Sequence, residues 1–380
     1  MADSATAVRR TIPVCAAVLD GREREYALKC LETNWVSSLG EFIPRFERTF
    51  ADLCEVRHGV ACSSGTAALH LALEALEVGP GDEVIIPAFT LIVSANVVCF
   101  TGATPVLVDV RPDTWCIDPD LIEAKITPRT KAVMVVHMYG HPCDMQAVCR
   151  IARRHGLAVI EDAAQAHGAR VQGRPVGGIG DIGAFSFYGN KIITTGEGGM
   201  LVTRNAALAE RAALLRNQAF GEERFVHNHV GFNYRMTNIQ AAIGVAQCER
   251  MARKVRRKRE IAAFYDDLLA EEEAIQRPAK AAGCEPAYWM YAILLKDSFG
   301  CGKAEVRDRL AEDGIETRSF FTPMHRQPVY QGGHRRWPDL RGDYPVSDVL
   351  GERGLYLPSG LNLTYDDQVH VVEQLRACKH

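Results

Sequence analysis

The sequence predicts an α/β protein with a mainly parallel central sheet, covered by helices on both faces, and a smaller α/β unit after it. Two patterns support this prediction. From about residue 60 to residue 203, short apolar runs alternate with helical patterns, as in repeated strand–helix–strand units. After residue 237 a long helical pattern reaches about residue 271, and a second α/β pattern follows. Because 380 residues suffice for about two domains, we place these at 12–250 and 251–380, with the N-terminal segment able to pack on the smaller one.

The expected strands are short, apolar and bounded by glycine or polar residues, as buried strands of a parallel sheet are. Helical patterns separate several of them, at 67–76 and 145–155. The strands are expected at 59–62, 83–87, 104–109, 132–137, 157–162, 184–187 and 199–203, with one more at 290–295 in the smaller unit.

Composition excludes several classes of protein. The net charge of −3 argues against a general nucleic-acid binder, which needs a positive surface. Twelve cysteines are scattered without any CxxC pair, which indicates reduced thiols and a cytoplasmic location rather than a secreted disulfide framework. No apolar run is long enough for a membrane span. The apolar run 11–19 contains Pro13 and ends in the charged segment 20–25, so we expect it to enter the fold as an edge segment.

Lys191 lies between an expected strand and a glycine-rich loop. The aromatic residues Phe185, Phe187 and Tyr188 come shortly before it. A single lysine is most often a solvated surface residue, and that interpretation stays open here. An amine desolvated by aromatic neighbours has a lowered pKa and can condense with an aldehyde. Lys191 therefore predicts a pyridoxal 5′-phosphate (PLP) site, provided that the chain carries the other groups that PLP needs.

Asp162 ends the expected strand 157–162, at the sheet edge where open α/β folds bind ligands. A buried carboxylate needs a cation or hydrogen-bond donors, and in a PLP enzyme the cation is the protonated ring nitrogen. Capping of a following helix is the alternative. Asp162 precedes Lys191 by 29 residues, which leaves room for both groups to approach opposite sides of one ring. We expect Gln165, one helical turn after Asp162, to reach the phenolic oxygen of that ring.

A phosphate site is predicted at Ser64, Gly65 and Thr66, where a strand turns into a helix. Free N–H groups and the positive end of the helix dipole favour an anion there. Gly65 lets the backbone approach closely, and the two hydroxyls can donate. Ordinary helix capping explains Ser and Thr equally well. Ser186, five residues before Lys191, adds a further hydroxyl.

Three other motifs have simpler explanations. Residues 178–183 match GxGxxG, but they run into a strand, whereas a dinucleotide-binding loop opens a helix. The spacing of His and Cys in 137–144 fits no strong zinc pattern, so we expect no metal. Seven of the ten residues 250–259 are basic, which most simply predicts a solvated helix face. A role of this run near a substrate diphosphate is the weaker alternative.

Taken together, these motifs resemble the DegT/DnrJ/EryC1/StrS family of PLP-dependent nucleotide-sugar aminotransferases. The resemblance covers nearly the whole chain from about Ile12. It implies the aspartate aminotransferase fold (type I). The segments 34–40, 187–196 and 316–325 resemble, within the family, enzymes that aminate C4 of GDP-4-keto-6-deoxy-D-mannose. The motifs that carry the resemblance are 64–66, 161–166, the Lys191 loop and 231–242.

The resemblance also implies roles for individual residues. Lys191 would bond covalently to PLP, and Asp162 would partner the ring nitrogen. Asn233 would reach the phosphate of a neighbouring subunit, which implies a homodimer with shared active sites. His325 and the 35–38 segment, with Trp35 and Ser37, would lie near the nucleotide-linked keto sugar. L-Glutamate is the implied amino donor. The residues expected to hold the phosphate are Gly65, Thr66 and Ser186, with Ser64 beside them.

One position departs from the family pattern. Many relatives carry an aromatic residue where this chain has Leu91, so either Leu91 or Phe89 would pack on the cofactor ring. Alternative functions are amino transfer to a UDP- or dTDP-linked keto sugar, a PLP-dependent sugar dehydratase, a regulator that only binds the cofactor, and a dehydrogenase. Family dehydratases replace the lysine by histidine, whereas the lysine is present here, which favours amino transfer.

Overall fold

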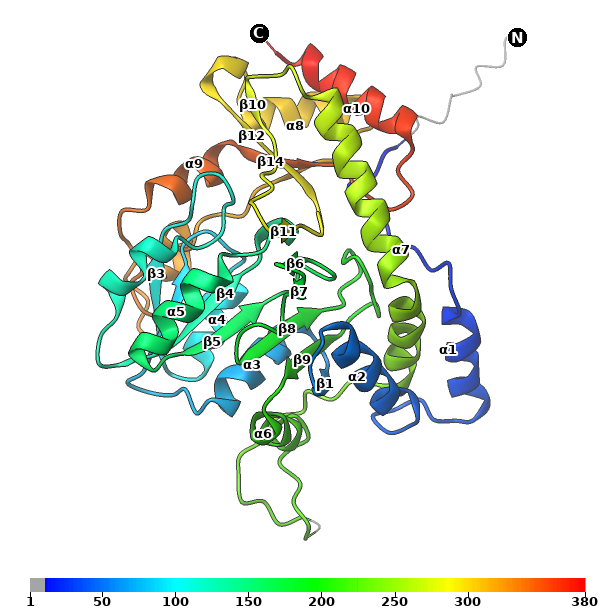
Figure 1. Cartoon of the computed structure of the whole chain (residues 1–380), viewed down its shortest axis with the longest axis vertical. Coiled ribbons are helices and arrows are strands. Elements are labelled where there is room, and N and C mark those ends of the chain that lie inside the picture. The colour runs from blue at the N-terminus through cyan, green and yellow to red at the C-terminus, as the bar shows by residue number, and fades with distance from the viewer. Residues whose placement is uncertain (1–10, 224, 380) are drawn as a thin grey trace.

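The structure is a computed structural model that describes residues 11–223 and 225–379. A seven-stranded sheet forms its centre (Figure 1). Five neighbouring strands, from β8 to β3, run parallel, whereas β9 is antiparallel to both of its neighbours. The predicted mainly parallel sheet is thus confirmed. In spatial order its strands are β1 (His58–Cys62), β9 (Gly199–Thr203), β8 (Ile182–Ser186), β5 (Ala158–Asp162), β4 (Thr130–Val136), β2 (Glu83–Pro87) and β3 (Thr104–Val108).

Alternate residues of each strand enter two different apolar layers, because side chains of a strand point to opposite faces. On β5, Val159 joins one layer and Ile160 the other. The Val159 layer packs against α2 (Phe42–Leu53), α5 (Met145–His155) and the first half of α7 (Asn238–Leu268). The Ile160 layer packs against α3 (Gly65–Ala75), α4 (Val93–Phe100) and α6 (Ala206–Arg216). Helices therefore cover both faces, as predicted.

Local signals in the sequence set the helix ends. The Ser64 hydroxyl accepts a hydrogen bond from the backbone N–H of Ala67 and caps α3. Asp144 caps α5 in the same way, and Gly156 ends that helix with a left-handed φ of 65°. Thr237 and Gln240 form a reciprocal capping box at the start of α7. These caps satisfy backbone groups that a helix end leaves without partners.

A smaller unit carries its own antiparallel sheet and apolar cluster. The second half of α7 contributes to this cluster, so one continuous helix runs through residue 250, where the sequence suggested a domain boundary (Figure 1). α1 (Glu23–Glu32) packs on the same long helix. The other elements are β10 (Ile275–Gln276), β12 (Tyr291–Leu295), β14 (Gly354–Leu357), β13 (Arg318–Ser319), α8 (Lys303–Glu312), α9 (Pro345–Arg353) and α10 (Tyr365–Ala377), with a separate three-stranded sheet of β11 (Cys284–Glu285), β6 (Arg170–Val171) and β7 (Arg174–Pro175).

The segment before α1, called here the N-terminal arm (residues 11–20), enters the fold as expected. Ile12 forms a parallel bridge with Ile315 and belongs to the apolar cluster of the smaller unit. The backbone N–H of Val14 donates to Glu316 Oε2 over 2.9 Å. The arm therefore ties the beginning of the chain to its last third.

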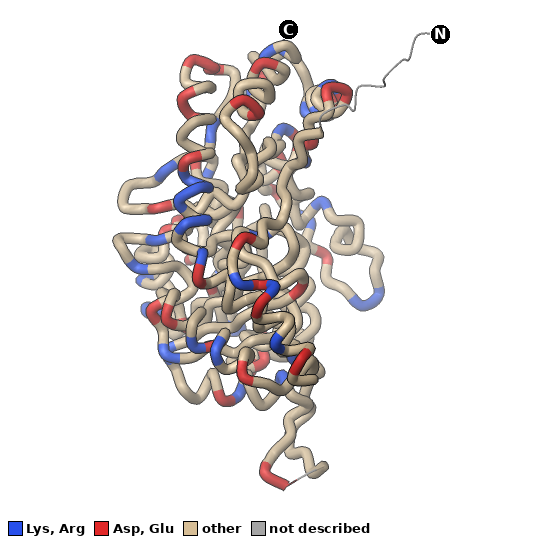
Figure 2. Tube along the Cα trace, turned by 90° about the vertical axis from the view of Figure 1, so that its right-hand side faces the viewer, with Lys and Arg blue, Asp and Glu red and all other residues tan. Residues whose placement is uncertain are grey.

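The basic run 250–259 lies on α7, but only part of it is a solvated face. Lys254 and Lys258 are 4% and 2% exposed, so the prediction of a wholly solvated run is wrong for these two lysines. Their amines donate to backbone carbonyl oxygens, of Val18 for Lys254 and of Trp289 for Lys258. Over the rest of the molecule, acidic and basic residues are interspersed (Figure 2).

The glycines of residues 178–183 serve packing, which agrees with the rejection of a dinucleotide loop. A Cβ at Gly183 would lie 2.2 Å from the carbonyl oxygen of Gly177, and one at Gly180 would lie 2.8 Å from that of Val159. Such contacts are far inside van der Waals distance, and backbone atoms cannot move away cheaply.

Gly183→Ala should therefore lower the free energy of unfolding by about 2 kcal/mol or more. Urea unfolding measures the change. Gly79→Ala is the matched control, because the nearest atom to its Cβ would lie 4.0 Å away. Equal stability of the two variants would contradict the packing argument.

Candidate active site

Lys191 lies in the loop between β8 and β9, where the sequence placed it. Its Nζ atom sits 3.7 Å from the centroid of the Trp289 ring. Desolvation by burial lowers the pKa of Lys191 to about 8, although the nearby charge of Asp162 raises it. The expected desolvated amine is therefore present. The aromatic ring that contacts the amine differs from the expectation. It belongs to Trp289, whereas Tyr188, one of the expected aromatic neighbours, is half exposed.

Asp162 is buried at the C-terminal end of β5. Its Oδ1 accepts a hydrogen bond from the backbone N–H of Ala164 over 3.1 Å. Burial raises the pKa of Asp162, and the charge of Lys191 opposes that shift. Among the described residues no ion pair joins the two groups, yet each alters the pKa of the other. The carboxylate and the amine are therefore both desolvated and interact electrostatically without forming an ion pair.

Two of the predicted phosphate residues, Gly65 and Ser186, lie against each other. Gly65 packs so closely on Ser186 that a Cβ on Gly65 would lie 2.7 Å from the Ser186 Cβ. The backbone N–H groups of Gly65 and Thr66 begin α3 and have no acceptor among the residues that the structure describes. Ser64 is committed to capping, since its hydroxyl accepts from Ala67. Both the capping and the anion-binding interpretation of Ser64–Gly65–Thr66 therefore apply, to different atoms.

Gln165 and Phe89 differ from their expected arrangement. Residues 163–168 form successive turns rather than a helix, and the Gln165 Oε1 accepts from the backbone N–H of Tyr139 over 2.7 Å. Phe89 is 0% exposed and packs on Phe320 with ring centroids 5.7 Å apart. Leu91 is 43% exposed, and which of the two residues packs on the cofactor ring stays a prediction.

The remaining predicted residues lie in two other places. Residues between Thr33 and Glu41 line a hollow of about 540 Å³, and Leu39 also lines an adjoining hollow of about 390 Å³ with Arg235 and Met236. Trp35 lines the first and is 55% exposed, while Ser37 accepts from the N–H of Asn238 at the start of α7. Asn233 is exposed nearby and accepts from Arg235. No contact of the described chain joins Trp35, Ser37 or Asn233 to Lys191.

His325 lies at the opposite side of the sheet edge, on the turn Met324–Arg326. The backbone N–H of Met324 donates to the carbonyl of Ala88, next to the end of β2. The imidazole is buried against Tyr344, and its Nε2 lies 2.8 Å from Asp348 Oδ1. Its Nδ1 is buried and has no hydrogen-bond partner among the described residues.

Sequence reasoning missed a buried carboxylate beside Asp162. Glu161 accepts hydrogen bonds from the backbone N–H groups of Gly177, Ile179 and Gly180 over 2.6–2.7 Å. The Nε2 of His137 lies 3.0 Å from Glu161, and the Nδ1 of His137 accepts from the N–H of Cys143. Although burial raises the pKa of Glu161, the hydrogen bonds from His137 and the glycine loop hold it below its usual value. The glycine motif thus encloses a carboxylate of the protein itself.

Glu161→Gln should lower the free energy of unfolding by about 3 kcal/mol, because the carboxamide presents an N–H₂ group to N–H donors in the protein interior. The pKa of Glu161 is lower in the folded state, so its contribution is complete above the unfolded-state pKa. It is lost as the pH falls through the folded-state pKa. Urea unfolding at pH 7 and at acid pH measures both effects. Glu55→Gln, on the surface, is the control. If the difference in unfolding free energy between wild type and Glu161→Gln were the same at acid pH as at pH 7, an ionised Glu161 would be contradicted.

The arrangement fits PLP on the evidence of this chain's own atoms. The raised pKa of Asp162 marks a buried carboxylate without a cation, which a protonated ring nitrogen would supply. The amine of Lys191 has a pKa of about 8, so much of it is neutral near neutral pH and able to attack an aldehyde. Two unpaired N–H groups at a helix start suit a phosphate. No group of metal-ligating side chains was found in residues 11–223 and 225–379.

A mainly parallel seven-stranded sheet with one antiparallel strand, and a buried amine electrostatically coupled to a strand-end carboxylate, define a PLP-dependent enzyme of the aspartate aminotransferase fold (type I). The model of the DegT/DnrJ/EryC1/StrS aminotransferase family matches residues 18–376. The chain belongs to this family. The predicted family, fold class, enzyme class and cofactor are confirmed.

Individual relatives match over nearly their whole length. The GDP-perosamine synthase of Caulobacter vibrioides is 48% identical over 370 residues, which are 96% of this chain and 97% of the relative. The GDP-perosamine synthase of Escherichia coli O157:H7 is 42% identical, with 96% and 97% covered. The PLP form of the putative sugar aminotransferase Spr1654 of Streptococcus pneumoniae has a TM-score of 0.89 and 27% identity, with 97% of this chain and 98% of that chain covered. In the described residues, no helix is both long and apolar enough to cross a membrane.

Proposed function

We propose that this protein transfers the amino group of L-glutamate to C4 of GDP-4-keto-6-deoxy-D-mannose and so makes GDP-perosamine. The observation that carries the chemistry is the desolvated amine of Lys191 electrostatically coupled to the buried carboxylate of Asp162. The substrate rests on relatives named GDP-perosamine synthase at 48%, 42% and 41% identity.

In this proposal the residues act on a bound PLP. Lys191 would hold the cofactor covalently through its Nζ. Once glutamate has freed this amine, it would take a proton from the substrate carbon as a general base and deliver it to the cofactor as a general acid. Asp162 keeps the ring nitrogen protonated. When bound, PLP supplies the electron sink that makes the proton removable. The N–H groups of Gly65 and Thr66 and the hydroxyl of Ser186 hold the phosphate.

A homodimer with shared sites completes the proposal. Trp35 lines one of the adjoining hollows, Asn233 is exposed beside Arg235, and neither has a described contact with Lys191 of its own chain, which supports their serving the site of a second copy. His325 would lie near the sugar nucleotide; the support from this chain is that its Nδ1 has no hydrogen-bond partner among the described residues. A cytoplasmic location remains a prediction that rests on the scattered cysteines.

The test is to incubate the purified protein with PLP, isotope-labelled glutamate and a panel of 4-keto-6-deoxy sugars linked to GDP, UDP or dTDP. Product masses should show labelled nitrogen in the GDP-linked sugar. If only the UDP- or dTDP-linked sugar gave labelled product, GDP would be the wrong nucleotide in the proposed substrate. A sugar dehydratase would release ammonia and leave no aminated sugar. A regulator would bind PLP but fail to exchange nitrogen with glutamate.

A further inference from the structure

Separate parts of the chain meet at the carbonyl oxygen of Asn190, the residue before Lys191. The indole Nε1 of Trp289 donates to this oxygen over 2.8 Å. The Sγ of Cys15, on the N-terminal arm, approaches the same oxygen at 3.5 Å. The backbone that carries Lys191 is therefore held from outside its own loop.

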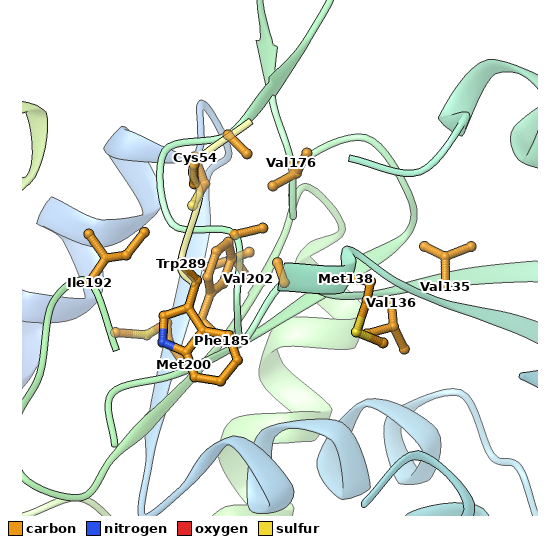
Figure 3. Close-up of a cluster of buried hydrophobic side chains, with 14 of the residues drawn as sticks. Cys54, Val135, Val136, Met138, Val176, Phe185, Ile192, Met200, Val202 and Trp289 are labelled. Atoms are coloured by element: carbon orange, nitrogen blue, oxygen red, sulfur yellow. The ribbon is translucent and has the colours of Figure 1, made fainter. Parts of the chain in front are cut away.

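The indole of Trp289 makes two contacts at once. Its N–H binds the Asn190 carbonyl, while its face lies against Lys191 Nζ at 3.7 Å. The ring is 4% exposed and stacks on Tyr139 at 6.3 Å and 17°. Trp289 belongs to the same apolar cluster as Phe185, Met200 and Ile192 (Figure 3). Packing on several sides thus fixes the ring in its position over the amine.

Lys258 holds the backbone of Trp289 from behind. Its Nζ donates to the carbonyl oxygen of Trp289 over 2.8 Å and also to that of Ser359. No carboxylate pairs with this ammonium among the described residues. A buried cation bound only by carbonyl oxygens is costly, which suggests that its position serves more than packing.

We propose that Trp289 is a catalytic residue of the amino transfer, holding the Nζ of Lys191 on its indole face, and that Lys258 is the positioning residue that fixes Trp289. This inference rests on the proposed function of Lys191. A cation is attracted to the face of an indole ring, and the indole has no lone pair available to accept a proton. The ammonium formed when Lys191 takes the substrate proton is thereby stabilised, and its proton remains available for return.

The first experiment uses Trp289→Leu and Trp289→Phe. Leucine keeps water away from Lys191 but removes the aromatic face, so the pKa of Lys191 should fall below about 8. A change of about threefold or more in proton affinity is expected. Phenylalanine keeps an aromatic face, so the pKa of Lys191 in Trp289→Phe should return most of the way to the wild-type value. The readout is the pH dependence of acylation of Lys191 in PLP-free protein, measured by mass spectrometry.

The second experiment compares Lys258→Met with Lys254→Met. Both lysines are buried on α7, but Lys254 binds Val18 and Gln247 rather than Trp289. Both variants should lose stability. Only Lys258→Met should shift the pKa of Lys191 and lower kcat, by roughly tenfold, with a KM for glutamate that stays within about threefold.

Two outcomes would overturn the inference. One is an unchanged Lys191 pKa in Trp289→Leu. The other is an equal effect of the two lysine variants on that pKa, which would show a structural role only. If wild-type protein fails to bond PLP through Lys191, the proposed function fails instead. The acylation measurement needs neither PLP nor a sugar nucleotide, so the two failures are distinguishable.

Discussion

Lys191→Ala should abolish covalent binding of PLP and reduce turnover by about a thousandfold or more, because one side chain supplies both the bond to the cofactor and the proton transfer. The absorbance band of covalently held PLP should disappear, while non-covalent binding through the phosphate residues can remain. Absorbance spectra and a glutamate half-reaction measure the two effects. Full transaminase activity in this variant would refute the assignment of Lys191.

The pH dependence sharpens this test. Only the neutral amine attacks an aldehyde, and burial lowers the pKa of Lys191 to about 8. The rate at which PLP-free protein bonds PLP should therefore rise with pH up to about 8 and level off above it. An ordinary exposed lysine would show a rise that continues toward about pH 10. Lys296→Ala, at an exposed site, is the control and should behave as wild type.

Asp162→Asn should lower kcat by about a hundredfold to a thousandfold, because a neutral carboxamide cannot hold a proton on the ring nitrogen. The change is nearly isosteric, and the carboxamide oxygen can still accept the N–H of Ala164, so the fold should persist. Steady-state kinetics and the dissociation constant of PLP measure the loss.

Acid pH separates an electrostatic role from a structural one. Burial raises the pKa of Asp162, so its carboxylate is neutralised at a higher pH than an ordinary aspartate. PLP affinity in the wild type should weaken as the pH falls through that raised pKa, whereas Asp162→Asn should lack this dependence. Asp144→Asn is the control, since Asn caps a helix as well as Asp does. Wild-type kinetics in Asp162→Asn would remove the carboxylate from the mechanism.

Local patterns were sufficient to predict the sheet and the main groups of the site. A short apolar run and the glycine or polar residues that bound it determine a strand such as β5. Its last residue, Asp162, must then lie at the sheet edge. The same logic placed Lys191 in the connection after β8. The helical turn expected at Gln165 is absent because the hydrogen bonds from Ala166 to Ala163 and from Ala169 to Ala166 close turns, not a helix. The role of Gln165 toward the cofactor stays a prediction. Its side chain consequently binds the backbone of Tyr139.

Contacts between distant segments could not be predicted in this way. Trp289 reaches the lysine loop from 99 residues beyond Asn190, and nothing in its own surroundings indicates a partner. In the sequence, Lys258 cannot be distinguished from the other members of the basic run. Its burial depends on which face of α7 packs against the smaller unit, and the sequence of the run does not reveal that face. Trp35 and Asn233 present a third difficulty: their expected partner is a second copy, and a pattern within one chain cannot test that.

The tie at Asn190 bears on when the site can form during synthesis. Val14 meets Glu316 across 302 residues of chain, and Cys15 meets Asn190 across 175. The N-terminal arm must therefore wait for Glu316 before this tie can form. A nascent polypeptide that has completed its large sheet still lacks the indole over its amine. The reactive nitrogen acquires its final surroundings only after Trp289 has been synthesised.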